Sequence, residues 1–284
     1  GIRDQPRSRG LGDVYKRQGE ARSKGASKIL AAGPEQSNLC ALTAAACAKA
    51  GLDCELIINA AEPARKEGNL LLEELLGTKI HFLGPCDGTV RNRRMEELAA
   101  AYQSAGEQVY VVRNGATTGR GALGYTAAVV EMKRQCEDLG IGRMTIFAPG
   151  GNGGVAAGLI YGNQLMGQPF RIVIVSVEDD RETLTAHIRS TISEAEEITG
   201  LPMDVSVEQA AEITDAYRGG GWGENTKESQ QAVLSFARSE GIFIENVYTS
   251  KVLVGMMDWI EQEKVSGPVC YLHTGGLGSL FAQY

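Results

Sequence analysis

Five consecutive residues near the middle of the chain, Gly150-Gly151-Asn152-Gly153-Gly154, have the composition of a loop that holds a phosphate group. They follow an apolar run at 144–148, which we expect to be a buried strand, and they precede a helix-like run at 155–165. Glycines allow a tight bend in which successive backbone N–H groups face one point. The following helix adds the positive end of its dipole. The loop therefore predicts a site for a phosphorylated cofactor.

Two polar residues at a predicted helix start form a second candidate site. Ser37 and Asn38 follow a short apolar run at 29–32 and open a helix-like segment at 38–50. A polar side chain at a helix N-terminus can cap the first backbone amides, and it can also face a ligand. The sequence leaves both roles open for these two residues.

Two further candidates lie toward the C-terminal end of the chain. Thr274 ends an apolar run and precedes two glycines, so its hydroxyl could meet a ligand or could belong to a turn at the strand end. Tyr248 is a candidate proton carrier or substrate contact. A phenol suits acid–base chemistry near neutral pH only where nearby charges lower its pKa. A tyrosine in the core is the alternative interpretation.

The elements that must position these residues alternate regularly along the chain. Apolar runs typical of strands occupy residues 29–32, 55–59, 79–83, 108–113, 144–148, 171–177 and 269–273. Helical patterns lie between them, at residues 38–50, 69–76, 94–105, 122–139, 227–239 and 250–264. This alternation predicts an α/β fold, with parallel sheets covered by helices. The Gly- and Thr-rich segment 114–121 is the place where we expect the chain to pass between domains.

Bulk composition narrows the functional class. The chain has 284 residues and a net charge of −7, which allows one large or two modest domains and argues against a nucleic-acid surface. No apolar segment is long enough to span a bilayer. Three dispersed histidines do not suggest a metal cluster. The six cysteines contain no CxxC pair and lie mostly in apolar runs, as free thiols do in a reducing compartment, so we expect a cytoplasmic protein.

The first eighteen residues differ from the rest of the chain. They lack core-like periodicity, and they carry four arginines, Arg3, Arg7, Arg9 and Arg17. Their end, the segment 13–18, resembles a string that recurs at the ends of unrelated environmental-sequence translations. We therefore expect residues 1–17 to be foreign to the protein, with a disordered basic arm as the alternative.

A dinucleotide-binding fold is one interpretation of the central glycines. Gly151, Gly153 and Ala156 match the G-x-G-x-x-G/A fingerprint after a strand, and Glu178 ends the next strand, where an acidic residue can bind a ribose hydroxyl. The fingerprint lies in mid-chain, however, after four earlier predicted strands. No His or Lys is placed to move a proton beside a hydride. An NAD-dependent oxidoreductase therefore stays an alternative.

Several blocks together give a second interpretation. In order along the chain they are Gln36-Ser37-Asn38, residues 68–72, residues 121–125, the glycine loop with residues 157–159, residues 247–251, and His273-Thr274-Gly275-Gly276. From about residue 20 to the C-terminus the sequence resembles the D-cysteine desulfhydrase / 1-aminocyclopropane-1-carboxylate deaminase family. The resemblance implies the tryptophan-synthase-β-like fold of fold-type-II enzymes that use pyridoxal 5'-phosphate, with two three-layer α/β domains.

The resemblance also implies roles for individual residues. The phosphate would lie on residues 150–154, Asn38 would reach the phenolic oxygen of the cofactor, and the hydroxyl of Thr274 would meet the pyridine nitrogen. Ser37 would lie beside the substrate carboxylate or the reacting carbon, and Tyr248 would carry a proton. The substrate pocket would contain Gln36, Trp222 and Thr249. Trp222 stands where the family usually has a tyrosine, so stacking or shape is expected of it rather than proton transfer.

Two positions separate the activities of this family. Deaminases carry Tyr-Glu and His-Leu-Gly-Gly, whereas desulfhydrases carry Tyr-Ser or Tyr-Thr and His-Thr-Gly-Gly. Tyr248-Thr249 and His273-Thr274 therefore resemble the desulfhydrase pattern. The resemblance implies a lyase that performs α,β-elimination on a D-amino acid such as D-cysteine, giving pyruvate, ammonia and sulfide. 1-Aminocyclopropane-1-carboxylate deamination is the alternative.

The chain departs from the family pattern at several positions. Asn152 and Val155 replace the two hydroxyl residues of the usual Gly-Ser-Gly-Gly-Thr loop, and a valine cannot donate a hydrogen bond to phosphate. Leu39 stands where a histidine is frequent, and Asn246 replaces the usual proline. These changes favour a different substrate within the same class.

The family's cofactor-linking lysine has no counterpart in register. The matching position falls near Gly10, and Lys16 has neither the flanking glycines nor the right offset. We expect that the native N-terminus was lost; a non-catalytic homologue is the alternative. The expected domains are a small α/β domain at 18–124 and a large one at 125–284. By resemblance, the protein is expected to be a homodimer that takes a small amino-acid substrate.

Overall fold

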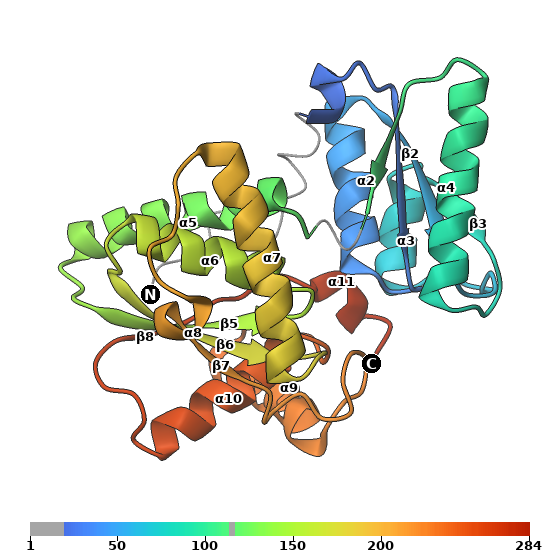
Figure 1. Cartoon of the computed structure of the whole chain (residues 1–284). Coiled ribbons are helices and arrows are strands. Elements are labelled where there is room, and N and C mark those ends of the chain that lie inside the picture. Colours follow the sequence, from blue (N-terminus) through green and yellow to red (C-terminus); the bar gives the residue numbers. More distant parts are fainter. Residues whose placement is uncertain (1–19, 114–116) are drawn as a thin grey trace. The chain divides into compact units, whose positions relative to one another are not determined.

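The computed structural model describes residues 20–113 and 117–284, which form two compact units (Figure 1). The first unit holds residues 20–113 together with Leu277–Tyr284, and the second is Thr117–Gly276. Each unit has a four-stranded parallel sheet of its own. The segment 1–17 with Lys16 and Gly10, and residues 114–116 of the expected passage between domains, lie outside the described residues.

The first sheet has the strand order β3-β2-β1-β4, with all neighbours parallel. Its strands are β1 (Lys28–Gly33), β2 (Asp53–Ile58), β3 (Lys79–Phe82) and β4 (Val109–Val112). Successive residues of β1 face opposite sides: Ile29 packs with Cys47 on one face, and Leu30 packs with Met95 on the other. A parallel sheet buried on both faces explains why these strands read as continuous apolar runs.

Helices cover both faces of this sheet. α2 (Asn38–Ala50) lies on one face and α4 (Gly88–Ser104) on the other, while α3 (Gly68–Leu75) packs on α2 and α11 (Leu277–Leu280) packs on α3. Ser37 is the N-cap of α2, and Gly51 ends that helix with a left-handed φ of 65°. The carboxyl end of β1 therefore leads directly into the start of α2.

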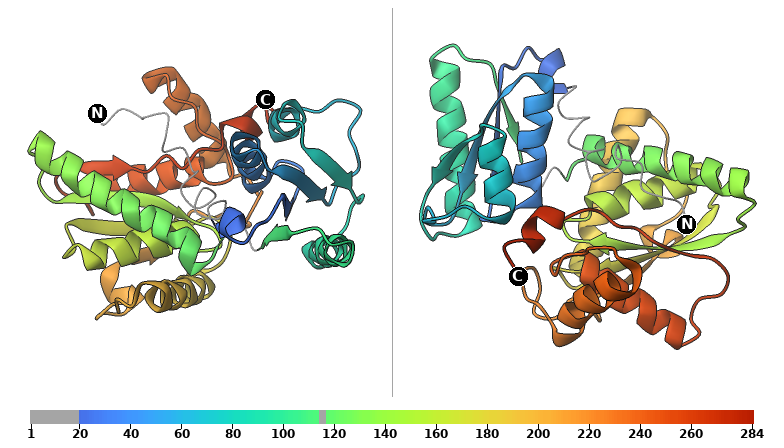
Figure 2. Two further views of the ribbon diagram at one scale, coloured as in Figure 1. Left: turned by 90° about the horizontal axis from the view of Figure 1, so that it is seen from above. Right: turned by 180° about the vertical axis from the view of Figure 1, so that it is seen from behind.

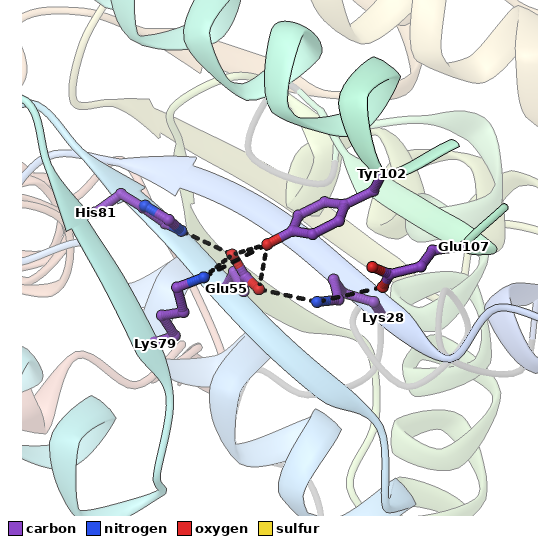
Figure 3. A network of polar contacts seen from close by, with 6 residues as sticks. All are labelled: Lys28, Glu55, Lys79, His81, Tyr102 and Glu107. Atoms are coloured by element: carbon purple, nitrogen blue, oxygen red, sulfur yellow. Dashed lines mark hydrogen bonds and ion pairs between the residues drawn. The ribbon is translucent and has the colours of Figure 1, made fainter. Parts of the chain in front are cut away.

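A polar network crosses the amino ends of the strands of the first unit (Figure 3). The buried carboxylate of Glu55 accepts hydrogen bonds from Lys28 Nζ (2.9 Å), His81 Nε2 (2.7 Å) and Tyr102 Oη (2.8 Å), and Lys79 Nζ lies 3.2 Å away. Burial alone would raise the pKa of Glu55, but these contacts outweigh burial and hold the pKa at about 2. The network lies at the opposite edge of the sheet from Ser37 and contributes to stability.

The second sheet has the order β7-β6-β5-β8, again with all neighbours parallel. Its strands are β5 (Met144–Gly150), β6 (Phe170–Ser176), β7 (Glu212–Thr214) and β8 (Val269–Tyr271). α5 (Gly119–Leu139), α6 (Gly154–Leu165), α7 (Arg181–Thr199) and the short α8 (Val207–Ala210) enclose the larger core on one face. α10 (Thr249–Glu261) lies on the other face, and α9 (Lys227–Glu240) packs on α10 (Figure 2).

The predicted α/β fold class is confirmed, because each unit has a parallel sheet covered by helices. None of the named helical patterns covers α7, α8 or α11, and no named strand covers the three residues of β7. α4 also begins at Gly88, six residues before the expected start at 94, because Asp87 accepts a hydrogen bond from the amide of Val90 and caps the helix.

No helix in the described part of the chain is long and apolar enough to cross a membrane. All six cysteines are free thiols, with Cys40, Cys47 and Cys136 buried.

Candidate functional site

The predicted phosphate loop and Thr274 lie at the same edge of the second sheet. β5 and β8 are neighbours, with Thr145 opposite Val269 and Phe147 opposite Tyr271, and Gly150 and Thr274 each follow three residues further on. From β5 the chain continues to β6 on one side and returns at β8 on the other side. Ligands of open α/β sheets bind outside the carboxyl ends of the strands at such a reversal point.

The glycine loop has a conformation that larger residues would disturb. Gly153 is the N-cap of α6 with a φ of 87°, and no side chain caps the first turn of that helix. A Cβ on Gly150 would lie 2.5 Å from Leu184 Cδ2, and one on Gly154 would lie 3.2 Å from Thr117 Oγ1. The first amides of α6 are therefore left for an acceptor outside the helix, and an anion is the acceptor that this geometry favours.

A buried carboxylate organises the start of α10. Glu245 is 0% exposed and accepts hydrogen bonds from the amides of Val247 (2.6 Å), Tyr248 (2.8 Å) and Thr249 (2.7 Å). Burial raises the pKa of Glu245, and these hydrogen bonds act against that rise. The hydroxyl of Thr249 donates to the same carboxylate at 3.0 Å and accepts from the Glu245 amide at 2.9 Å. Thr249, expected in the substrate pocket, thus has its side chain engaged within this turn.

Tyr248 lies against the glycine loop. A Cβ on Gly151 would come within 3.1 Å of Tyr248 Cε1, so the ring occupies space that a side chain at position 151 would need. The indole Nε1 of Trp222 donates a hydrogen bond to Tyr248 Oη at 2.7 Å. Burial raises the pKa of Tyr248 and the charge of Glu178 adds to the rise, whereas the hydrogen bond from Trp222 lowers it. The predicted residues Gly151, Trp222 and Tyr248 are thereby brought together.

Glu178 also lies in this group, although the sequence analysis considered it only as a possible ligand of a ribose hydroxyl. It follows β6, and its Oε2 would lie 3.7 Å from a Cβ on Gly151. Burial raises the pKa of the Glu178 carboxyl, and the neighbouring charge of Asp179 raises it further.

The candidates of the first unit gather around Asn69. The amide of Asn69 donates to Gln36 Oε1 (2.8 Å), and its Nδ2 donates to Asn38 Oδ1 (2.8 Å) and to the carbonyl of Gln36 (3.0 Å). Ser37 Oγ accepts from the amide of Cys40 at 3.3 Å, which is the capping role that the sequence left open. Asn69 lies within the block 68–72 but was not predicted as a site residue, because its role depends on the tertiary contact between α3 and the start of α2.

A family model for pyridoxal-phosphate dependent enzymes matches residues 9–275. The chain belongs to this family. The match begins within the arginine-rich N-terminal segment. A crystal structure of an ACC deaminase homologue is similar at 30% identity with a TM-score of 0.86, covering 95% of this chain and 81% of that one. The chain is therefore a pyridoxal-phosphate-dependent enzyme of the ACC deaminase/D-cysteine desulfhydrase group, and the resemblance stated from the sequence is confirmed.

More distant enzymes share the fold. The processed form of threonine deaminase isoform 2 from Solanum lycopersicum has a TM-score of 0.63 at 14% identity, covering 95% of this chain and 71% of that one. A pyridoxal 5'-phosphate-dependent aspartate racemase has a TM-score of 0.64 at 15% identity, covering 95% of this chain and 80% of that one. The family assignment takes the place of the dinucleotide-binding interpretation of the central glycines.

The residues present fit the phosphate group of the family's cofactor. The loop offers unshielded amides at the start of α6, and added Cβ atoms at positions 150, 151 and 154 would each meet a neighbour within 3.2 Å. The loss of hydroxyls at Asn152 and Val155 leaves these backbone donors in place. A cradle that depends on backbone N–H groups tolerates such changes in its side chains.

Proposed function

We propose that this chain is a pyridoxal-phosphate-dependent lyase that performs α,β-elimination on a D-amino acid such as D-cysteine. The observation that carries the proposal is the glycine cradle at the carboxyl end of β5 with Tyr248 packed against Gly151. Thr249 and Thr274 favour elimination over deamination, because they match the desulfhydrase pattern at the two discriminating positions. The products expected from D-cysteine are pyruvate, ammonia and sulfide.

Three of the cofactor contacts that the resemblance implies can be assigned to residues of this chain, whereas the cofactor-linking lysine cannot. Residues 150–154 would bind the phosphate through backbone amides, Thr274 would donate its hydroxyl hydrogen bond to the pyridine nitrogen, and Asn38 would contact the phenolic oxygen. When bound, the cofactor supplies an electron sink for the carbanion at the substrate α-carbon. A neutral threonine beside the pyridine nitrogen leaves that nitrogen less protonated than a carboxylate would, which moderates the sink.

Tyr248 is suited to donate a proton rather than to remove one. Its raised pKa keeps the phenol neutral near pH 7, so the hydroxyl still carries its hydrogen. The indole N–H of Trp222 can only donate, so at this contact the phenol oxygen is the acceptor. The hydrogen on Tyr248 Oη is therefore available to another acceptor, and we propose that this acceptor is the leaving group or the substrate.

Ser37 would orient the substrate. Its oxygen accepts the capping hydrogen bond from the Cys40 amide, and its hydroxyl also lies within hydrogen-bond reach of the Cys40 thiol. We propose that the hydroxyl hydrogen turns to the substrate carboxylate when substrate binds. The hydrogen bonds of Asn69 to Gln36 and Asn38 would hold the start of α2 in a fixed shape for this purpose.

Deamination of 1-aminocyclopropane-1-carboxylate is the second candidate. It is favoured by the similarity at 30% identity to the structure of an ACC deaminase homologue. The same pocket would then open a ring instead of expelling a sulfur leaving group.

The test uses purified protein with added pyridoxal 5'-phosphate and four substrates: D-cysteine, L-cysteine, D-serine and 1-aminocyclopropane-1-carboxylate. We expect sulfide and pyruvate from D-cysteine. Ring opening without sulfide release would replace the proposal by the deaminase alternative. The variant Thr274→Leu installs the deaminase residue at one of the two discriminating positions and should lower sulfide release relative to ring opening.

The absence of a lysine at the position that matches the family's cofactor-linking lysine lowers the activity that we expect. We propose that this protein binds the cofactor weakly and turns over slowly, because Gly10 stands at the position where the resemblance implies the cofactor-linking lysine. Equilibrium dialysis measures the binding directly, with Gly153→Val as a variant that blocks the cradle. Borohydride reduction followed by peptide mapping would reveal any lysine that links the cofactor. Cofactor binding unaffected by Gly153→Val would contradict the proposed cradle.

A further inference from the structure

Lys251 is a buried residue whose ammonium group hydrogen-bonds to backbone carbonyls. It is the third residue of α10 and 0% exposed. Its Nζ donates to the carbonyl oxygens of Arg218 (2.7 Å), Gly221 (2.7 Å) and Val177 (3.2 Å). An ammonium group has three N–H donors, and all three are used here. Lys251 thereby joins α10 to the end of β6 and to the segment 218–224.

The segment that Lys251 binds has little conformational preference of its own. It contains Gly219, Gly221 and Gly223, whose φ values are 63°, 115° and 78°. Glycines lose more backbone freedom on ordering than other residues do, so such a segment needs external contacts to hold one conformation. Its internal hydrogen bonds are long: the Gly221 amide to the Arg218 carbonyl and the Glu224 amide to the Gly221 carbonyl are both 3.3 Å.

The same segment carries Trp222. The indole is 40% exposed, so burial does not fix its position, yet its N–H lies 2.7 Å from Tyr248 Oη. Tyr248 itself is fixed from the other side, because its amide donates to the buried Glu245 carboxylate. The geometry of the Trp222–Tyr248 contact therefore depends on what holds Gly221, the residue before Trp222.

We infer that Lys251 is a positioning residue, which holds the glycine-rich segment 218–224 so that the indole of Trp222 keeps its hydrogen bond to Tyr248. The consequence for catalysis rests on the proposed function, in which Tyr248 donates a proton. With the phenol oxygen held as an acceptor, the hydroxyl hydrogen points away from Trp222. Lys251 contacts neither group directly and acts through the backbone of Arg218 and Gly221.

Lys251 does not serve as a nucleophile in this arrangement. With all three N–H groups donating to carbonyls, the nitrogen is held as the charged ammonium and has no free electron pair. Burial lowers the pKa of Lys251 and the charge of Arg218 adds to this, whereas Glu245, Glu224 and Glu178 favour the charged form. The three carbonyl dipoles aimed at Nζ favour the charged form as well.

The test removes the ammonium and follows the segment directly. Lys251→Met keeps the length of the side chain, and Lys227→Met, at an exposed position just beyond the segment, is the matched control. Trypsin cleavage after Arg218, mapped by mass spectrometry, reports opening of the segment, and we expect at least about a tenfold faster rate in Lys251→Met. Fluorotryptophan labelling gives a second readout, because the chain has 2 tryptophans and Trp222→Phe assigns their resonances. The Trp222 resonance should move toward the position of free tryptophan.

The outcomes separate this inference from the proposed function. Wild-type cleavage rates and an unmoved Trp222 resonance in a folded Lys251→Met variant would overturn the inference, whatever the enzyme does with D-cysteine. If Lys251→Met does not fold, the same two measurements are made on Lys251→Gln. In the wild-type protein, hydrogen exchange of residues 219–224 at the rates of an unstructured peptide would also overturn the inference. Recovery of Lys251 joined to the cofactor after borohydride reduction would contradict it too. Failure to bind pyridoxal 5'-phosphate would instead count against the proposed function alone.

Discussion

Trp222 offers a direct test of the role of Tyr248. By the resemblance stated from the sequence, it stands where the family usually has a tyrosine. Its N–H donates to Tyr248 Oη at 2.7 Å. Trp222→Phe keeps an aromatic ring and removes the donor. If Tyr248 donates the proton as proposed, we expect kcat to fall about fivefold to tenfold with little change in KM, because Tyr248 loses one hydrogen bond.

The same variant should also change the pH dependence of kcat in a defined direction. The hydrogen bond from Trp222 lowers the pKa of Tyr248, so its removal should raise that pKa and move the alkaline limb of kcat to higher pH. Steady-state kinetics across the alkaline range provide the measurement, and Trp259→Phe, on the far half of α10, is the control. An alkaline limb that stays in place would remove Tyr248 from the role of proton donor.

Glu73 is a buried carboxyl with an unusual pH dependence. It is 0% exposed, neither side-chain oxygen has a hydrogen-bond partner among the described residues, and burial raises its pKa to about 8. The folded state therefore keeps a proton that the unfolded state releases above its ordinary pKa of about 4.3. Its contribution to stability is full below that value and is lost as pH rises toward about 8.

Glu73→Gln removes that pH dependence. We expect the variant to be more stable than wild type at pH 8, because the folded wild-type protein loses about 1.4 kcal/mol for each pH unit between the two pKa values. Urea unfolding of wild type and variant at acidic and alkaline pH measures the difference. Glu74→Gln, at the adjacent exposed position, should leave the pH dependence unchanged. Parallel curves for Glu73→Gln and wild type would show that Glu73 ionises normally.

At the level of single residues, the type and order of the residues in the sequence singled out several candidates for the site. The glycine loop, Tyr248 and Trp222 were predicted, and the structure brings them together. Glu245 and Lys251 were not predicted as site residues, although both are 0% exposed beside Tyr248. A charged side chain in a sequence is most often a surface residue. Only the tertiary structure shows that backbone groups pair with these two charges.

Among the elements, the contact between α5 and α6 depends on one small residue. A Cβ on Gly158 would overlap the carbonyl oxygen of Ala122 and would lie 2.7 Å from the Cβ of Tyr125. Gly158→Ala should therefore lower the free energy of unfolding by about 1–3 kcal/mol, because two helix backbones must move apart. Thermal unfolding measures the loss. The control is Gly142→Ala, where nothing lies within 4 Å of an added Cβ. Equal stability of the two variants would mean that the helices separate at little cost.

The pattern of apolar residues predicted most strands and helices but omitted α7, and the reason is physical. α7 is rich in charged and polar residues, and only one stripe, with Leu184, Ile188, Ile192 and Ala195, is buried. That stripe follows helical spacing, and Asp180 and Gly200 cap the two ends of the helix. The signal was therefore present. The three-residue strand β7 has too few residues to show any period, and its pairing with β6 defines it.

For the molecule as a whole, the two units offer separate spectroscopic signals. Both tryptophans of the chain, Trp222 and Trp259, lie in Thr117–Gly276, so tryptophan fluorescence reports the second unit alone. Far-ultraviolet circular dichroism reports both units. Each unit has buried apolar clusters of its own, so each can unfold as a cooperative body.

Glu55→Gln tests whether the units unfold separately. Wild-type Glu55 has a pKa lowered to about 2, so its contribution is present above its ordinary pKa and is lost as pH falls toward about 2. Removing the charge takes from Lys28 its buried partner and leaves the more exposed Glu107 at 3.4 Å, which should destabilise the first unit by about 1–3 kcal/mol at neutral pH. The dichroism transition should move to lower denaturant while the fluorescence transition stays in place.

Glu107→Gln, which removes the more exposed partner of Lys28, should shift neither transition by more than a small amount. If both signals of Glu55→Gln moved together, the two sheets would form one cooperative unit, and the stabilising network at the first sheet would then also support the site at the second.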